Sequence, residues 1–531
     1  MRRFSAVRLC DAEQGVHEVF QREGYTCPIR IDSLDLGPGQ LKKFPYIKVT
    51  TWMQHLLETN RLCRQMVGVA SIPKMKLVLK EYWNRFKKVR PTHGVFDLAE
   101  QGVLQLDCCI PFYSHSDEGR SQKHLPLFVL STHGVLGRGT RAYISSGRHR
   151  APLRRNQMGM NFVGKTWSTQ FMFATVLKSI TVEYPDVVDT LVKEFSADCH
   201  RLLHQGIISQ DGQAKFWFCH VGTKGDLPAL QKLGSFKRSF SHVPKGPSSK
   251  KACKGICFKC KAGQEHDASV GQAAYPFEDV NRNALWTTTL HTDAPWDVLP
   301  SIVTGLPLDL PSQIDFFRTD LWRNAHLGIL RQFVASGFVA IVESQQSDLP
   351  CLPDGSIDAK FQWLTNLYRQ FWRAKGRRPV VLDINRETML FPASTASPVG
   401  KWSKGQASTE MMLFLEHFGQ QYIRGKTANV LLNTIVSWLG CHYLWDGFCT
   451  VILFYFPFGF PHVVGDFLMP LFLSRLTQLR TSILQHQSST DLGFGWERTQ
   501  LSGLAICYFS FWPSTHSVPA SPSTNRRGVS L

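Results

Sequence analysis

Two aspartates that lie far apart in the sequence each come at the end of an apolar run typical of a buried strand. Asp117 follows residues 103–116 (VLQLDCCIPFYSHS), and Asp226 comes soon after residues 215–223 (KFWFCHVGT). Two ionised carboxylates held close together repel strongly, and a bound divalent cation relieves that repulsion. Mg²⁺ prefers such hard oxygen ligands, and ions held by acidic side chains activate water or a 3′-hydroxyl for phosphodiester displacement. The pair therefore indicates metal-dependent phosphodiester chemistry, with Asp107 as a rival for the first position and ordinary turn residues as the alternative.

A cluster of cysteines downstream of Asp226 has the spacing of metal ligands. Cys257 and Cys260 form a Cys-x-x-Cys pair, in which two thiolates on one tight turn can bind a single tetrahedral Zn²⁺ ion. Cys253, together with His266 or His242, would complete a set of four ligands. The alternative is a pair of free thiols in a loop. A redox role is less favoured, because no thioredoxin-like pattern surrounds the pair.

Two segments without acidic residues concentrate positive charge. Residues 137–155 contain six arginines, and residues 237–261 contain eight lysines or arginines, beginning with Lys237 and Arg238. The whole chain has 60 lysines and arginines against 41 acids, a formal net charge of +19. Such an excess favours a polyanionic partner, either nucleic acid or an anionic membrane surface. Because phosphate contacts release counterions, we expect the two segments to bind DNA or RNA, with a generally basic surface as the alternative.

The segments around these residues predict a mixed α/β sheet that would position them. Strands are expected at residues 103–116, 125–136, 169–182 and 215–223, with a helix at 187–207 between the last two. A helix is the alternative for residues 169–182. If the second strand is antiparallel to the first, the first and fourth strands can lie side by side and parallel. Their ends would then bring Asp117 and Asp226 together.

The run KGDLPALQKLGSF, residues 224–236, is followed by a basic loop and the Cys-x-x-Cys pair, and it resembles the second-aspartate region of CACTA-like cut-and-paste transposases. Residues 316–333 (FFRTDLWRNAHLGILRQF) are similar to a second segment of that family, with Asp320 at its aspartate and Arg323 where the family has a histidine. Residues 401–418 are similar to the helix that carries the third acid. Ala407 stands at the expected position there, and Glu410 is the nearest acid on that helix.

The resemblance, which covers about residues 105–420, implies an RNase H-like mixed sheet of strand-strand-strand-helix-strand order with helical N-terminal and C-terminal additions. Residues 110–120 (IPFYSHSDEGR) also resemble a set of uncharacterised proteins derived from mobile elements, which favours Asp117 over Asp107. The implied activity is hydrolysis and strand transfer on DNA, in the nucleus. Because Arg323 and Ala407 depart from the family pattern, a non-catalytic nucleic-acid-binding protein is the alternative.

The resemblance, the cysteine spacing and the basic segments together give a predicted role to each candidate site residue. The catalytic carboxylates would be Asp117, Asp226 and Glu410, and the ligands of Mg²⁺ or Mn²⁺ would be Asp117, Asp226 and Asp320. A structural Zn²⁺ ion would be bound by Cys253, Cys257, Cys260 and His266. The DNA backbone would be contacted by Arg138, Arg141, Arg148, Arg150, Arg154, Arg155, Lys237 and Arg238.

Composition predicts how the chain is organised. We expect a mixed, helical N-terminal module at 1–98, a transposase-like domain at 99–425 with a basic, cysteine-containing insertion at 237–310, a hydrophobic segment at 426–480 and a disordered tail at 481–531. Residues 428–445 and 447–465 carry no formal charge, and each approaches the roughly 20 residues that cross a bilayer. They predict a buried subdomain, a membrane hairpin that would make this a membrane protein, or a segment without a selected fold. The 14 scattered cysteines and an N-terminus without an apolar segment favour a reducing compartment.

Overall fold

The chain forms two compact units in a computed structural model. The structure describes residues 12–23, 29–120, 126–137, 169–242, 252–277, 279, 283–320, 326–328, 330–392, 398–433 and 435–436. Unit 1 is made of Met1–Asn84, Val95–Lys224 and Pro300–Pro307, and unit 2 of Arg85–Gly94, Gly225–Leu299 and Leu308–Leu531. Asp117 therefore belongs to unit 1, whereas Asp226 belongs to unit 2.

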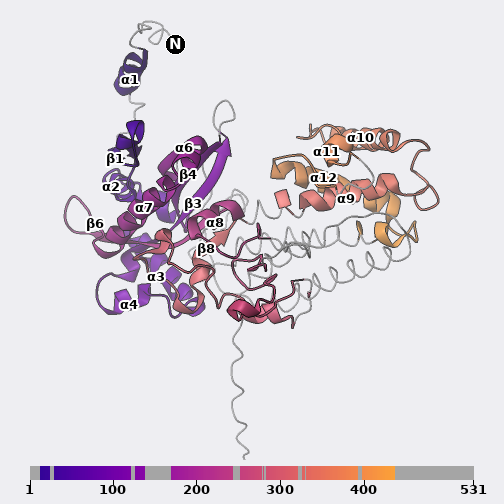
Figure 1. Cartoon of the computed structure of the whole chain (residues 1–531). Helices are drawn as coiled ribbons and strands as arrows, with labels where there is room; N and C mark the ends of the chain where they lie inside the picture. The colour runs from indigo at the N-terminus through magenta and orange to yellow at the C-terminus, as the bar shows by residue number, and fades with distance from the viewer. Residues whose placement is uncertain are drawn as a thin grey trace, which may run out of the picture. The chain divides into compact units, whose positions relative to one another are not determined.

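Unit 1 contains a mixed sheet with the strand order β5-β4-β3-β7-β6 (Figure 1). The strands are β3 (Cys109–Arg120), β4 (Pro126–Gly134), β5 (Phe171–Leu177), β6 (Ile207–Ile208) and β7 (Lys215–Gly225). The β3–β4, β4–β5 and β6–β7 pairs are antiparallel. Two side-chain contacts join β3 to β7. The Phe112 ring stacks on His220, and the hydroxyl of Ser114 donates a hydrogen bond of 2.8 Å to Oγ1 of Thr223. These contacts advance in the same direction along both strands, as they do in a parallel pair.

Helix α7 (Val187–His204) packs on one face of this sheet. Its apolar residues recur at three- and four-residue steps, so they lie on one side of the helix and are buried there. The Phe195 ring lies edge-on to Phe173 of β5, with centroids 5.1 Å apart, and to His220 of β7 at 5.4 Å. The short helix α6 (Lys178–Glu183) connects β5 to α7.

Short elements precede the sheet in the chain. They are α1 (Ala12–Arg22), β1 (Asp32–Leu34), η2 (Gly39–Lys43), β2 (Phe44–Tyr46), α2 (Val49–Glu58), η3 (Cys63–Val67), α3 (Ile72–Val89), α4 (Val95–Glu100) and η4 (Leu106–Cys108). The later η10 (Ser301–Val303) also belongs to unit 1. β1 and β2 form a small antiparallel ladder of their own.

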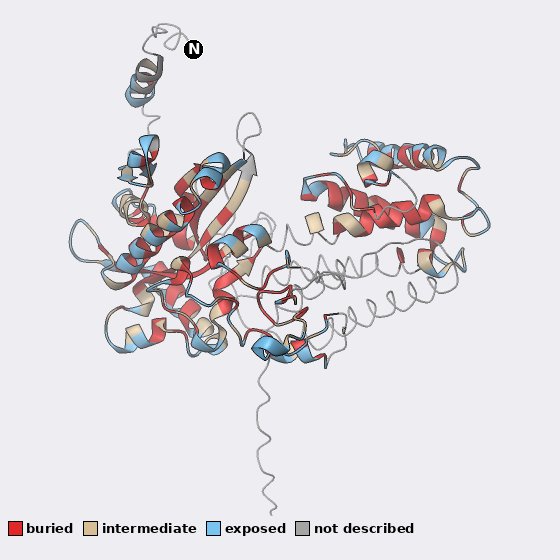
Figure 2. Ribbon diagram, viewed as in Figure 1, coloured by how far each residue is buried: buried red, intermediate tan, exposed pale blue. Residues whose placement is uncertain are grey.

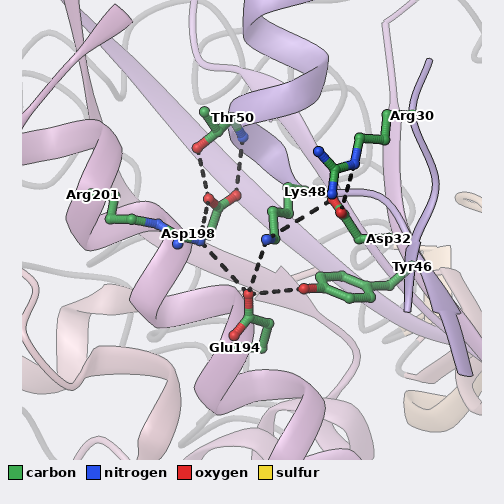
Figure 3. A network of polar contacts seen from close by, with 8 residues as sticks. All are labelled: Arg30, Asp32, Tyr46, Lys48, Thr50, Glu194, Asp198 and Arg201. Carbon is green, nitrogen blue, oxygen red and sulfur yellow. Dashed lines mark hydrogen bonds and ion pairs between the residues drawn. The ribbon is translucent and has the colours of Figure 1, made fainter. Parts of the chain in front are cut away.

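A polar network joins this N-terminal segment to α7 (Figure 3). The fully buried carboxylate of Asp198 accepts hydrogen bonds from the amide and hydroxyl of Thr50, at 3.0 and 2.6 Å. It thereby caps the first turn of α2 from a neighbouring helix. Glu194 accepts a hydrogen bond of 3.0 Å from the hydroxyl of Tyr46 and lies 4.0 Å from the ammonium of Lys48. Two acids on α7 therefore hold the segment that leads into α2.

Unit 2 begins at the end of β7. There β8 (Phe317–Thr319) pairs with β7, and the amide of Asp320 donates to the carbonyl of Gly225 at 2.8 Å. Helix α8 (Leu227–Gly234) starts directly after Asp226. The loops that follow contain η8 (Ala268–Val270), η9 (Leu285–Thr289) and η11 (Leu310–Phe316). Their apolar core gathers Cys253, Ile256, Cys257, Cys260, Ala262, Phe277, Ala284, Trp286 and Leu290.

The remaining described part of unit 2 is helical. Its helices are α9 (Leu330–Glu343), α10 (Ile357–Ala374), α11 (Arg386–Met389), α12 (Gly405–Phe418) and η13 (Gly419–Ile423). Figure 2 shows α9 buried along most of its length, whereas α10 alternates between buried and exposed residues. Within the described residues, one helical segment, His326–Glu343, is long and apolar enough to cross a membrane, and 71% of it is buried inside the protein. A core helix shows the same property, so this finding is weak support for a membrane span.

The mixed α/β class predicted from sequence is confirmed. The predicted strands and helix follow one another in the expected order, but α6 and β6 were not predicted, and the predicted helix 187–207 ends at His204, before β6. The predicted first strand starts later, at Cys109, because Leu106–Cys108 forms a helical turn. The predicted third strand ends at Leu177, where its partner β4 begins, so the residues after it have no ladder to join and turn into α6. Asp117 lies inside β3, opposite Val129, rather than after its end. Residues 437–531, with most of the uncharged tail, lie outside the described residues.

Candidate functional site

One face of the unit 1 sheet carries a row of polar side chains that we call the polar face. It consists of Tyr113, His115 and Asp117 of β3, Ser131 and His133 of β4, and Lys224 of β7. Side chains two residues apart in a strand point to the same face, and the ladder pairs Tyr113 with His133 and His115 with Ser131. The opposite face carries Phe112 and His220, which pack toward α7. The sheet therefore has an apolar side covered by α7 and a polar side with chemistry-bearing residues.

Lys224 lies against two residues of the polar face. Its ammonium lies 4.3 Å from the centre of the Tyr113 ring and 3.3 Å from Nε2 of His133. His133 is buried, and burial together with the charge of Lys224 holds the pKa of its imidazole well below the usual value. The imidazole is therefore neutral near pH 7. Because an ammonium can only donate, Nε2 of His133 is the acceptor of this hydrogen bond.

β7 ends at Gly225, and the next residue, Asp226, is the N-cap of α8. Oδ1 of Asp226 accepts a hydrogen bond of 2.9 Å from the amide of Ala229, as in a helix N-cap. Pro228 lies in the first turn, where a missing amide hydrogen costs nothing. The Asp320–Gly225 backbone bond brings Asp320 beside the residue that precedes Asp226. Through this bond, two of the predicted metal ligands lie near each other in unit 2. Both acids are half-buried.

Glu410, the predicted third acid, is engaged in contacts within the helical part of unit 2. Its carboxylate is buried and accepts hydrogen bonds of 2.7 Å from the amide of Val380 and from the side chain of Gln406. Arg377 lies 3.6 Å from the same carboxylate. These contacts anchor the segment after α10 to α12. The catalytic role of Glu410 stays a prediction.

The predicted zinc ligands lie in the loop region of unit 2. Among the described residues, no three His, Cys, Asp or Glu side chains lie close enough together to hold a metal ion. Cys253 Sγ donates to the carbonyl of His242 at 2.8 Å, which requires a protonated thiol. His266 is exposed, whereas Cys257 and Cys260 are buried. The donor types suit Zn²⁺, and the zinc site at these four residues stays a prediction.

A buried charged cluster, which we call the Asp315 cluster, lies beside the Cys-x-x-Cys turn. Asp315 forms ion pairs with Arg90 and, at 3.5 Å, with Lys259, and it is hydrogen-bonded to Nδ1 of His291 at 2.5 Å. Arg90 also pairs with Asp309 at 3.1 Å. Burial alone would raise the pKa of the Asp315 carboxyl, but His291, Lys259 and Arg90 outweigh burial and hold that pKa well below its usual value. Asp315 is therefore ionised in the folded protein at neutral pH.

Of the eight residues predicted to contact DNA, the structure describes Lys237 and Arg238. Arg238 is buried and donates to the carboxylate and carbonyl of Asp293, both at 2.8 Å, and Lys237 forms an ion pair with Asp297. Their observed contacts are thus with acids of the same unit. The six arginines predicted to contact DNA (Arg138, Arg141, Arg148, Arg150, Arg154 and Arg155) lie outside the described residues.

Comparison of the chain with protein-family models, with curated proteins and with solved structures found no match.

Sequence reasoning missed the contribution of Lys224 and His133 to the polar face. Lys224 lies two residues before Asp226 in the run that carries the resemblance, so the sequence did indicate that it would be near the candidate site. His133 had no local signal, because only the antiparallel β3–β4 ladder brings it opposite Tyr113.

Proposed function

We propose that this protein binds DNA and cleaves or transfers phosphodiester bonds with a divalent cation, as a transposase-like enzyme on an RNase H-like sheet. The strand order β5-β4-β3-β7, with α7 between β5 and β7 in the chain, supports this proposal. So does the net charge of +19, which favours a polyanionic substrate. A basic DNA-binding protein without catalysis on the same scaffold is the outcome to be distinguished.

The observation that carries the proposal is the hydrogen bond from the amide of Asp320 to the carbonyl of Gly225. It brings together two acids that are separated by more than ninety positions in the sequence, Asp226 and Asp320. Mg²⁺ in phosphoryl-transfer sites is commonly bound by one or two carboxylates together with waters and substrate phosphates. Two carboxylates are therefore a sufficient protein contribution.

In the proposed site, each acidic residue is held in place by a different contact. Asp226 is held by its N-cap hydrogen bond to Ala229, which fixes one carboxylate oxygen and orients the other. Asp320 is held by the backbone bond to Gly225. A bound Mg²⁺ or Mn²⁺ ion would activate a water or 3′-hydroxyl and stabilise the leaving oxygen. The resemblance assigns a further ligand to Asp117 of unit 1, and that assignment is part of the proposal.

The proposal is tested by incubating the purified protein with a labelled DNA duplex and Mg²⁺ or Mn²⁺ and measuring nicking. We expect Asp226→Asn and Asp320→Asn to lower the nicking rate by at least about 100-fold while leaving duplex binding intact, because each removes a charged ligand. Asparagine is also a good N-cap residue, so the Asp226 variant should keep α8 folded. Asp117→Asn tests the third ligand in the same assay.

The matched control is Asp211→Asn, which changes an exposed turn aspartate of unit 1. It should nick as fast as the wild type. Duplex binding without nicking in either metal would remove the catalytic part of the proposal and leave a DNA-binding protein. A protein that binds no duplex would overturn the proposal as a whole.

A further inference from the structure

The C-terminal end of helix α10 carries a group of exposed cations that we call the α10 basic end. It consists of Arg369, Arg373, Lys375, Arg377 and Arg378. All five residues are exposed, and residues 359–382 contain no acid. The α10 basic end lies outside the two basic segments from which DNA contacts were predicted.

The way in which α10 ends brings these cations to one place. Gly376 has a φ of 64°, in the left-handed region that glycine favours, and its amide donates to the carbonyl of Arg373 at 3.0 Å. The amide of Arg377 donates to the carbonyl of Trp372, also at 3.0 Å. These are the two hydrogen bonds of a Schellman motif, which reverses the chain at the end of a helix. The residues that follow the turn therefore lie beside the last turn of α10.

Aromatic rings restrict two of the cations. The ammonium of Lys375 lies 4.6 Å from the centre of the Phe371 ring, and the guanidinium carbon of Arg377 lies 5.1 Å from the centre of the Trp372 ring. A ring attracts a cation through its quadrupole and carries no net charge. These contacts therefore hold the side chains without neutralising them.

The acids close to the α10 basic end balance only part of its charge. Asp383 forms an ion pair with Arg369, and Glu410 lies 3.6 Å from Arg377. The other three members form no ion pair within the part of the chain that the structure describes, and they are Arg373, Lys375 and Arg378. The helix dipole favours a cation in the last turn, which accounts for Arg373 but not for the residues beyond the helix.

The exposed side of α10 favours a nucleic acid over a membrane as the partner. A helix that lies on a membrane directs an apolar face toward the lipid, whereas α10 buries its large apolar residues and exposes polar ones between the cations (Figure 2). The exposed polar residues are Gln362, Asn366 and Gln370. Four of the five cations are arginines, whose planar guanidinium binds phosphate through two hydrogen bonds. Side-chain amides also bind phosphate and sugar oxygens.

We propose that the α10 basic end binds the phosphate backbone of a DNA duplex without reading its bases. This inference rests on the DNA-binding part of the proposed function and does not require cleavage. The phosphates are contacted by Arg373, Lys375 and Arg378, and the release of counterions favours binding. The helical part of unit 2 thus contributes a DNA contact of its own.

The experiment measures the dissociation constant of a labelled duplex at several salt concentrations, without divalent metal. The test variant of the full chain combines Arg373→Gln, Lys375→Gln and Arg378→Gln. We expect the slope of log affinity against log salt concentration to fall by about 2–3 and the affinity in about 0.1 M salt to fall at least about tenfold, because three phosphate contacts are lost. Two duplexes of unrelated sequence should be affected equally, since phosphate contacts carry no sequence information.

The matched control combines Lys42→Gln, Lys43→Gln and Arg61→Gln, which removes the same charge from exposed positions of unit 1. It should bind like the wild type. A second variant, Arg373→Lys with Arg378→Lys, keeps the charge and should keep the wild-type salt dependence. It separates the loss of charge from a disturbed end of α10.

The outcomes separate this inference from the proposed function. Equal affinity and equal salt dependence in the wild type and the test variant would overturn the inference and leave the proposed function in place. An equal loss in the control would also overturn it, because net charge alone would then explain the effect. Weaker binding by the test variant, without nicking by the wild type, would support the DNA contact and reject the chemistry.

Vesicles that contain an anionic lipid test the membrane alternative. We expect the wild type and the test variant to bind them equally. Vesicle binding that the test variant loses, together with an unchanged affinity for the duplex, would overturn the inference and assign the α10 basic end to a membrane surface.

Discussion

His220 occupies the apolar side of the unit 1 sheet as a neutral hydrogen-bond acceptor. The amide of Ser114 donates to its Nε2 at 3.2 Å, and the ring stacks on Phe112 with centroids 5.0 Å apart. Protonation of Nε2 would break the bond to Ser114 and place a charge between aromatic rings. Burial accordingly lowers the pKa of His220 to about 3. The residue stabilises the sheet only while it is neutral.

This arrangement predicts a dependence of stability on pH. The pKa of His220 is about 3 in the folded state and near its ordinary 6.5 in the unfolded chain, so the unfolded state takes up the proton first as the pH falls. The stabilisation is present above pH 6.5 and is lost toward pH 3, at up to about 1.4 kcal/mol per pH unit. Urea unfolding between pH 7.5 and 4 measures this slope.

His220→Gln should reduce the slope, because glutamine can accept the bond from Ser114 but does not titrate. His200→Gln, on the exposed side of α7, is the control and should keep the wild-type slope. An unchanged slope in His220→Gln would show that other groups carry the pH dependence.

At the scale of elements, β4 packs directly against the backbone of η3. A Cβ atom added to Gly134 would lie 2.3 Å from the carbonyl oxygen of Met66. A backbone atom cannot move aside as the end of a side chain can, so the glycine is required by the close approach of a strand to a helix. This contact helps to fix the β3–β4 hairpin that carries the polar face.

Gly134→Ala is therefore expected to destabilise unit 1 by about 2–3 kcal/mol, within the range of overpacking substitutions. Chemical denaturation monitored by tryptophan fluorescence checks this value. The comparison is Gly212→Ala, at a turn glycine with a φ of 69° and no atom within 4 Å of the added Cβ. It should cost only about 1 kcal/mol, from backbone conformation alone. Similar losses for the two variants would contradict the tight contact.

At the scale of the molecule, the Asp315 cluster joins parts of the chain that are distant in sequence. Arg90 comes from the segment before α4, Lys259 from the Cys-x-x-Cys turn and His291 from the loop after η9. The backbone amide of His291 also donates to the carbonyl of Lys259 at 2.8 Å. These segments of unit 2 are thus held by one buried carboxylate.

Asp315→Asn should destabilise unit 2 by about 3–5 kcal/mol, because it removes the carboxylate charge that lies against the buried ammonium of Lys259 and the half-buried guanidinium of Arg90. Guanidinium denaturation measures the loss, with Asp354→Asn in an exposed loop as the control. The effect has a pH signature as well. The pKa of Asp315 is lowered in the folded state, so its stabilisation is present at neutral pH and is lost as the pH falls below the ordinary aspartate value. A variant as stable as the wild type at pH 7 would contradict this role.

The sequence by itself determined the mixed α/β class and the order of the strands and α7 along the chain, whereas the placement of β3 beside β7 was only one possibility until the sheet was seen. The class and the order follow from local periodicity and turn residues, which depend on neighbours in the chain. It also singled out Asp226 and Asp320 as candidates, because each lies in a run that resembles a family motif. It did not identify the Asp315 cluster, because a lysine, a histidine and an arginine that far apart have no shared local pattern.

Only the tertiary structure decided which predicted residues have other partners and which residues meet. Arg238 is hydrogen-bonded to Asp293, and Glu410 accepts a hydrogen bond from the amide of Val380. No regular sequence spacing connects the members of either pair. His133 reaches Lys224 because strands β4 and β7 lie on either side of β3. Side-chain pairing depends on distances in space, and those are fixed only when the sheet and its helices have packed.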